Sequence, residues 1–212
     1  MTTTKGSRAS PLRLSYLTAY NALFCALWIS VLYTTLTNLS NGKPALFAAT
    51  SSRARWIQTA TLIEIIHAAT GLVRSPVSTT ALQVTTRTIQ VWMIWFSFPA
   101  STASSHAYAA LVLAWSVADA IRYAYLTLNL HARSPGWLLW LRYTMFYPLY
   151  PIGITAEWWL LYRAIEPAGQ VWWGLKPIFW ACLAAYVPGS YKMYTHMIKQ
   201  RRKTLGGGKK EV

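Results

Sequence analysis

The chain has 212 residues, of which 54% are hydrophobic and only 12% are charged. Soluble domains normally carry about 25% charged residues, so this chain has too little polar surface to cover a globule in water. Its formal net charge of +15 lies largely in the tails and short loops rather than on one basic face with interleaved aromatic residues, so nucleic-acid binding is not expected. The composition predicts an all-α integral membrane protein.

Six mostly apolar stretches follow one another, each near the roughly 20 residues that a transmembrane helix requires. They cover residues 16–36, 57–73, 78–98, 106–128, 138–162 and 171–191. Turn-forming residues separate them at 38–44, 75–76, 99–102, 134–136 and 166–169. The first stretch is too long for the core of a signal peptide. We predict a single bundle of six transmembrane helices over 15–197, with tails at 1–14 and 198–212.

Positive charge predicts the orientation of this bundle, because six spans place both termini on one side of the membrane. Twelve Lys and Arg residues gather on the side of the termini: Lys5, Arg8, Arg13, Arg74, Arg133, Lys192, Lys199, Arg201, Arg202, Lys203, Lys209 and Lys210. Lys43, Arg53 and Arg55 in the first opposite loop are an exception. Since cytosolic loops are enriched in Lys and Arg, both termini are predicted to be cytosolic.

The C-terminus carries a targeting signal if this orientation holds. Lys209 and Lys210 stand at the fourth and third positions from the end, after a glycine spacer. A dilysine pair at a cytosolic C-terminus is a receptor-read retention signal for the endoplasmic reticulum. The alternative is a plain solvated basic tail. Asn38 begins a glycosylation sequon, but it lies so close to the first span that we expect it to be unused.

Three of the five acidic residues fall inside the apolar stretches: Glu64, Asp119 and Glu157. A charge near the centre of the bilayer costs about 2.5–3.5 kcal/mol, so each must find a partner or serve a function. The intramembrane bases available as partners are Arg87, Arg122 and Arg142. Glu64 and His67 are three residues apart, as are Asp119 and Arg122, and such residues are neighbours on a helix. We expect both to be local structural pairs, which could also line a cavity.

Glu157 differs, because no base lies three or four residues from it. Tyr150 stands seven residues earlier, on the same helix face and about 10 Å away along the axis. Pro151 and Gly153 lie between them and predict a kink. A carboxylate and a phenol in a dry cavity can act as a base and an acid. The structural alternative is an interfacial tyrosine and a glutamate hydrogen-bonded across helices.

The segment 140–157, WLRYTMFYPLYPIGITAE, resembles the signature of the 3-hydroxyacyl-CoA dehydratases of very-long-chain fatty acid elongation, once called protein tyrosine phosphatase-like proteins. The segment 58–76, QTATLIEIIHAATGLVRSP, resembles the second span of that family. Further similar positions are Tyr16, Leu17, Tyr20, Asn21, Trp28, Gln83, Arg87, Trp115, Ser116, Ile121, Arg122 and Tyr123. The resemblance covers about 15–194. Asp119 departs from it, since the family is expected to carry Glu there.

The resemblance implies dehydration of a (3R)-3-hydroxyacyl-CoA to the trans-2-enoyl-CoA in the endoplasmic reticulum membrane, with no metal or organic cofactor. It places the catalytic pair on Tyr150 and Glu157. We assign Glu157 as the base at C2 and Tyr150 as the donor to the leaving hydroxyl, although the reverse is also open. Arg142 and Tyr143 are candidates to assist or to hold the bend. Implied partners are the condensing enzyme, the 3-ketoacyl-CoA reductase and the enoyl-CoA reductase of elongation.

The sequence also bears on other functions. The segment 67–74 imitates a phosphatase loop, but Ala68 occupies the place of the nucleophilic cysteine, which excludes that catalysis. Cys25 and Cys182 lie in apolar runs without a CxxC or His/Cys cluster, so no metal site is predicted. A transporter could use buried charges, but no repeat is visible. A non-catalytic scaffold of a lipid-synthesis complex would tolerate loss of Tyr150 and Glu157.

Overall fold

The structure is a computed structural model that describes residues 10–206, and every element in this range is helical. The elements are α1 (Pro11–Asn38), η1 (Leu39–Asn41), α2 (Lys43–Ala60), α3 (Ile63–Ala69), α4 (Val77–Ile89), the π-helical η2 (Gln90–Phe96), α5 (Pro99–Ala103), α6 (His106–Leu130), α7 (Gly136–Thr144), α8 (Phe146–Val171) and α9 (Leu175–Leu205). The all-α prediction is confirmed for these residues. Lys209 and Lys210 lie outside the described range.

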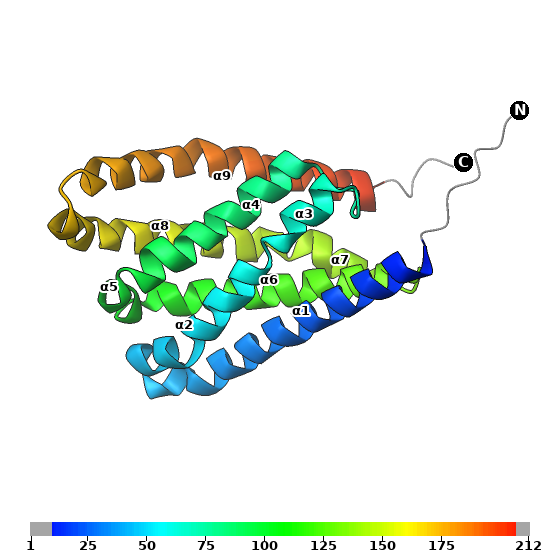
Figure 1. Ribbon diagram of the computed structural model, residues 1–212, viewed down its shortest axis with the longest axis horizontal. Coiled ribbons are helices and arrows are strands. Elements are labelled where there is room, and N and C mark those ends of the chain that lie inside the picture. The colour runs from blue at the N-terminus through cyan, green and yellow to red at the C-terminus, as the bar shows by residue number, and fades with distance from the viewer. Residues whose placement is uncertain (1–9, 207–212) are drawn as a thin grey trace, which may run out of the picture.

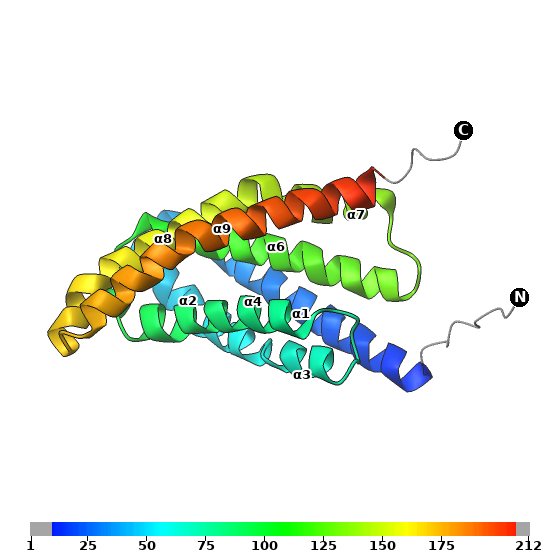
Figure 2. The same ribbon diagram turned by 90° about the horizontal axis from the view of Figure 1, so that it is seen from above.

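Helix α6 forms the centre of the bundle, packed against α1 on one side and α8 on the other. Figure 2 shows α8 and α9 lying together on one side of α6, with α1, α2, α3 and α4 on the other. Large side chains fill the space between these groups, and Trp28, Trp95 and Tyr108 are almost completely buried. The start of α1 and the end of α9 lie at the same end of the bundle (Figure 1).

The outer faces of the helices are apolar. Large hydrophobic side chains are exposed along them, among them Tyr33, Trp56, Trp159, Trp180 and Val187. Two helical stretches, Pro11–Asn41 and His106–Leu130, are long and apolar enough to cross a bilayer. Exposed apolar area on this scale requires an apolar environment, which is consistent with an α-helical membrane protein.

The second predicted range, 57–73, does not coincide with one helix. Helix α2 begins at Lys43, well before the apolar run, and the chain turns between Ala60 and Ile63 before α3. The charges of this polar helical segment find partners on other segments: Arg53 donates to Thr34 Oγ1 at 3.0 Å. The Arg55 guanidinium lies over a tryptophan and a phenylalanine ring of the neighbouring η2 segment. The three basic residues assigned to the first loop therefore stand on a helix.

The fifth predicted range, 138–162, is interrupted at Thr144–Met145, while α8 continues through Pro151. The break lies there because Pro148 has no N–H to donate to the carbonyl of Thr144, four residues earlier. The turn predicted at 166–169 is wrong, since α8 runs on to Val171. Gly169 is helical and lies beside the flexible side chain of Lys176, which a Cβ at this position would displace.

Candidate active site

Glu157 lies in the middle of α8 with only 9% of its surface exposed. Its Oε1 accepts a 3.0 Å hydrogen bond from Trp115 Nε1 on α6, and its Oε2 accepts a 3.1 Å hydrogen bond from the Tyr186 hydroxyl on α9. Within residues 10–206, no Lys, Arg or His forms an ion pair with it. Neutral donors from the two neighbouring helices therefore hold this carboxylate.

Tyr150 lies two turns before Glu157 on α8. Its hydroxyl donates to the backbone carbonyl of Ser190 at 3.3 Å, and its ring stacks on Tyr194 with the centroids 5.7 Å apart. Ser190 follows Tyr186 by four residues, so the two share one face of α9. Tyr150 and Glu157 therefore both reach the same face of α9, one turn apart on that helix.

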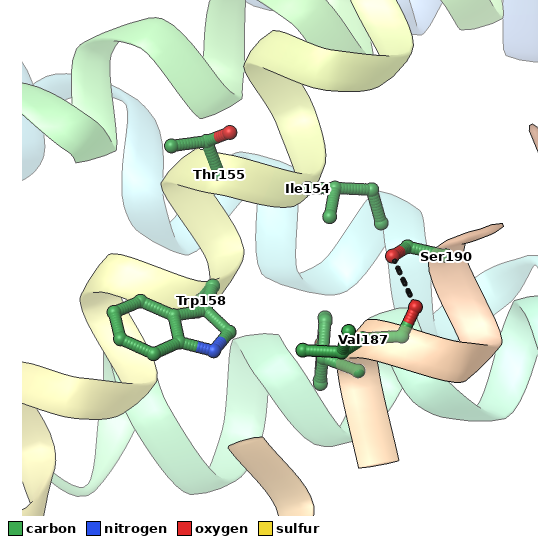
Figure 3. Close-up of a pocket in the computed structure, with 6 residues that line it drawn as sticks. Ile154, Thr155, Trp158, Val187 and Ser190 are labelled. Carbon is green, nitrogen blue, oxygen red and sulfur yellow. Dashed lines mark hydrogen bonds between the residues drawn. The ribbon is translucent and has the colours of Figure 1, made fainter. Parts of the chain in front are cut away.

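An open groove of about 230 Å³ adjoins these contacts between α8 and α9 (Figure 3). Its lining residues are Ile154, Thr155, Trp158, Tyr186, Val187 and Ser190. In Figure 3, Ile154 and Trp158 of α8 face Val187 and Ser190 of α9. Ser190 Oγ donates to the carbonyl of Val187 at 3.0 Å, so it is bound to its own helix. Two lining residues, Tyr186 and Ser190, are thus the α9 partners of Glu157 and Tyr150.

The other two intramembrane acids form a charged cluster with two arginines from other parts of the chain. Arg87 of α4 pairs with Asp119 of α6 at 2.6 Å. Arg122 pairs with Glu64 of α3 and makes a longer contact of 3.9 Å with Asp119. Tyr123 also donates its hydroxyl to Glu64. Both carboxylates are buried, and each is neutralised by a guanidinium from another helix.

The predicted local pairing of these acids is therefore wrong for Glu64 and secondary for Asp119. His67 bonds through Nε2 to the Tyr16 hydroxyl at 2.8 Å, while Glu64 takes its cation from α6. The register of α6 explains the difference, because it lets Asp119 reach Arg87 of α4 and lets Arg122 reach Glu64 of α3. Pairing across helices uses one arginine for two acids, which spacing along one helix does not predict.

One side chain joins the charged cluster to Glu157. The Arg87 guanidinium lies 4.1 Å from the centroid of the Trp115 ring, and the indole N–H of Trp115 donates to Glu157. Trp115 and Asp119 are four residues apart on α6 and share its inward face. A cation over an indole face is held by the ring quadrupole, so Arg87 and Trp115 fix each other's position.

Arg142 and Tyr143 lie on α7, beside the interruption of the fifth range. The Arg142 guanidinium lies over the rings of Tyr125 and Tyr143, at 4.6 and 5.6 Å from their centroids, and donates to the backbone carbonyl of Arg122 at 3.5 Å. These contacts attach α7 to α6. Both roles predicted for this pair, assistance at the site and holding the bend, stay predictions.

Tyr186 was not predicted as a site residue, and Trp115 was named only among the positions that resemble the family. A lone aromatic residue in an apolar span is usually a packing residue, so neither position carried a functional signal of its own. Both are found only when the helices that flank Glu157 are known. Across residues 10–206, no three His, Cys, Asp or Glu side chains converge as metal ligands would.

Residues 58–207 match the family described as protein tyrosine phosphatase-like protein, PTPLA. The probable very-long-chain (3R)-3-hydroxyacyl-CoA dehydratase of Schizosaccharomyces pombe is 39% identical, over 91% of this chain and 93% of that protein.

Two further relatives come from a plant and from human. The Arabidopsis thaliana very-long-chain (3R)-3-hydroxyacyl-CoA dehydratase PASTICCINO 2 is 38% identical, over 95% of this chain and 98% of that protein. The human very-long-chain (3R)-3-hydroxyacyl-CoA dehydratase 2 is 32% identical, over 92% of this chain and 82% of that protein. No solved structure matches the chain.

Proposed function

Because the chain belongs to the protein tyrosine phosphatase-like family, PTPLA, and its relatives are named very-long-chain (3R)-3-hydroxyacyl-CoA dehydratases, we propose that it is a hydro-lyase of fatty acid elongation. It converts the (3R)-3-hydroxyacyl-CoA to the trans-2-enoyl-CoA and water, without a metal or organic cofactor. The observation that supports the site most strongly is the buried carboxylate of Glu157, which forms no ion pair within the described residues and adjoins an open groove.

The reaction requires one group that removes a proton from C2 and another that protonates the departing C3 hydroxyl. The Trp115 indole donates to Oε1 of Glu157 and the Tyr186 hydroxyl donates to Oε2, so both oxygens accept, as in an ionised carboxylate. We assign Glu157 as the base. The C2–H electrons form the C2=C3 double bond, the C3–O bond breaks, and the Tyr150 hydroxyl donates its proton to the leaving oxygen. Glu157 then releases the proton taken from C2 and Tyr150 takes up a proton in place of the one it donated, which restores both groups.

The membrane arrangement follows from the same proposal. Six helical segments, with three composite ones at α2–α3, α4–η2 and α7–α8, cross the endoplasmic reticulum membrane with both termini in the cytosol. The basic residues near the ends of α1 and α9, and the shared end at which these helices begin and finish, support this orientation. The enzyme works there with the condensing enzyme and the two reductases of elongation, while the substrate chain dissolves in the bilayer.

The test is turnover of a long-chain (3R)-3-hydroxyacyl-CoA by the protein purified in detergent. Glu157→Gln and Tyr150→Phe each lower turnover about 10²–10⁴-fold, the usual contribution of an acid or base. Glu166→Gln and Tyr191→Phe, at exposed positions on the same two helices, retain wild-type turnover. Monodisperse elution of each variant shows that the fold is kept.

Two results would contradict the proposal. Turnover that survives in Glu157→Gln or Tyr150→Phe would place the acid and base elsewhere, and Arg142 and Tyr143 would be tested next. A wild-type protein that converts no chain length would instead support the non-catalytic scaffold.

A further inference from the structure

The groove between α8 and α9 has one polar edge and apolar walls. Ile154 and Trp158 form the α8 wall, and Val187 stands opposite on α9. The polar edge is formed by Tyr186 and Ser190, which are bound to Glu157 and Tyr150. A molecule in this groove therefore has apolar contacts along its length and, at one side, meets the two α9 residues that contact Glu157 and Tyr150.

The apolar wall continues beyond the groove along the boundary of the two helices. The Trp158 and Tyr162 rings stack with their centroids 5.7 Å apart, and Tyr162 meets Trp180 of α9 edge-on at 5.8 Å. Trp180 and Val187 are seven residues apart, on the same face of α9, and both are exposed. An aromatic and aliphatic path thus leads from the groove along the outer surface of the bundle.

We propose that this groove binds the part of the acyl chain nearest the reacting carbons, and that the rest of the chain follows the Trp158–Tyr162–Trp180 path. This inference rests on the proposed function, because it takes the acyl-CoA as the ligand. The volume of about 230 Å³ is below the 300–1,000 Å³ typical of pockets for drug-sized ligands, so a whole very-long chain does not fit inside it. An open groove that continues onto a lipid-facing surface accepts a long chain without an enclosed cavity of matching length.

Photolabelling tests the location without depending on turnover. The probe is a long-chain 3-hydroxyacyl-CoA with a diazirine in the proximal part of its acyl chain, applied to the full-length protein in detergent. Mass spectrometry is expected to find label on the α8 and α9 peptides that contain Ile154 and Val187, and unlabelled substrate should remove it. Competed label confined to other helices, or no competed label at all, would overturn the proposal.

Obstruction of the groove provides the second arm. Val187→Trp fills the space opposite Ile154, and kcat/KM for a long-chain substrate is expected to fall about tenfold or more. Ile178→Trp, at an exposed position on the same helix outside the groove, serves as the matched control and stays within about twofold of wild type. A fully active Val187→Trp protein would overturn the proposal. Competed label in the groove of a wild-type protein without turnover would instead reject the dehydratase while keeping the groove.

Discussion

The charged cluster of Glu64, Asp119, Arg87 and Arg122 differs from the Glu157 site in the kind of partner that each buried acid has. Glu64 and Asp119 are neutralised by guanidinium groups. Glu157 is equally buried, but its described partners are an indole and a phenol. Burial of an acid in a membrane bundle therefore does not by itself indicate catalysis. An acid committed to an ion pair stabilises the fold, whereas one held by neutral donors keeps a lone pair that can take a proton.

Trp115 is the point at which the two regions meet, since it lies under Arg87 and donates to Glu157. Substitutions elsewhere should separate the regions. Changes in the charged cluster should lower stability, and changes around Glu157 should lower turnover while stability is kept.

The largest effect on stability is expected from Glu64→Gln. Without this carboxylate, Arg122 keeps only the longer contact with Asp119, and loss of one partner from a buried pair costs about 3–5 kcal/mol. The measurement is the fraction of monodisperse protein after heating in detergent, compared with Glu157→Gln, which should keep wild-type stability. A stable Glu64→Gln protein without turnover would contradict this division of roles, because it would place Glu64 in the catalytic site.

A smaller effect, on turnover alone, is expected from Tyr186→Phe. This variant removes one of the two hydrogen bonds that orient Glu157, and hydrogen bonds to charged groups contribute about 1.5–3 kcal/mol. The value of kcat should fall roughly ten- to a hundredfold with KM and thermal stability unchanged, and Tyr191→Phe on the same helix provides the control. If KM rises while kcat is kept, Tyr186 acts only as part of the groove wall and does not position Glu157.

A helix was predictable over each apolar stretch, because an apolar run near the length of a membrane span usually forms a transmembrane helix. The predicted bounds were wrong where a helix extends over polar residues. Helix α2 extends through Arg53 and Arg55, whose partners lie on other segments. The sequence also did not predict the break at Thr144–Met145, where Pro148 has no N–H to donate to the Thr144 carbonyl, while the kink predicted at Pro151 and Gly153 stays a prediction.

Only the local features of the candidate site were predictable from the sequence. The isolation of Glu157 from any neighbouring base is a local property, so it could be read from residues three and four positions away. The partners of the acids could not be predicted, because Glu64 and Arg122 are 58 residues apart and meet only through helix packing. Tyr186 was missed for the same reason, since its contact with Glu157 depends on the register between α8 and α9.

The smallest effect is expected from Ser190→Ala, although this residue lines the groove and contacts Tyr150. The contact at 3.3 Å uses the backbone carbonyl, which alanine also supplies, and the Ser190 hydroxyl is bound to Val187 of its own helix. Turnover should therefore change less than about twofold, within the range of a neutral substitution. A loss as large as that of Tyr150→Phe would mean that the Ser190 hydroxyl itself takes part in proton transfer. The site would then include an α9 hydroxyl that transfers protons. In that case α9 would supply more than the neutral donor that holds Glu157.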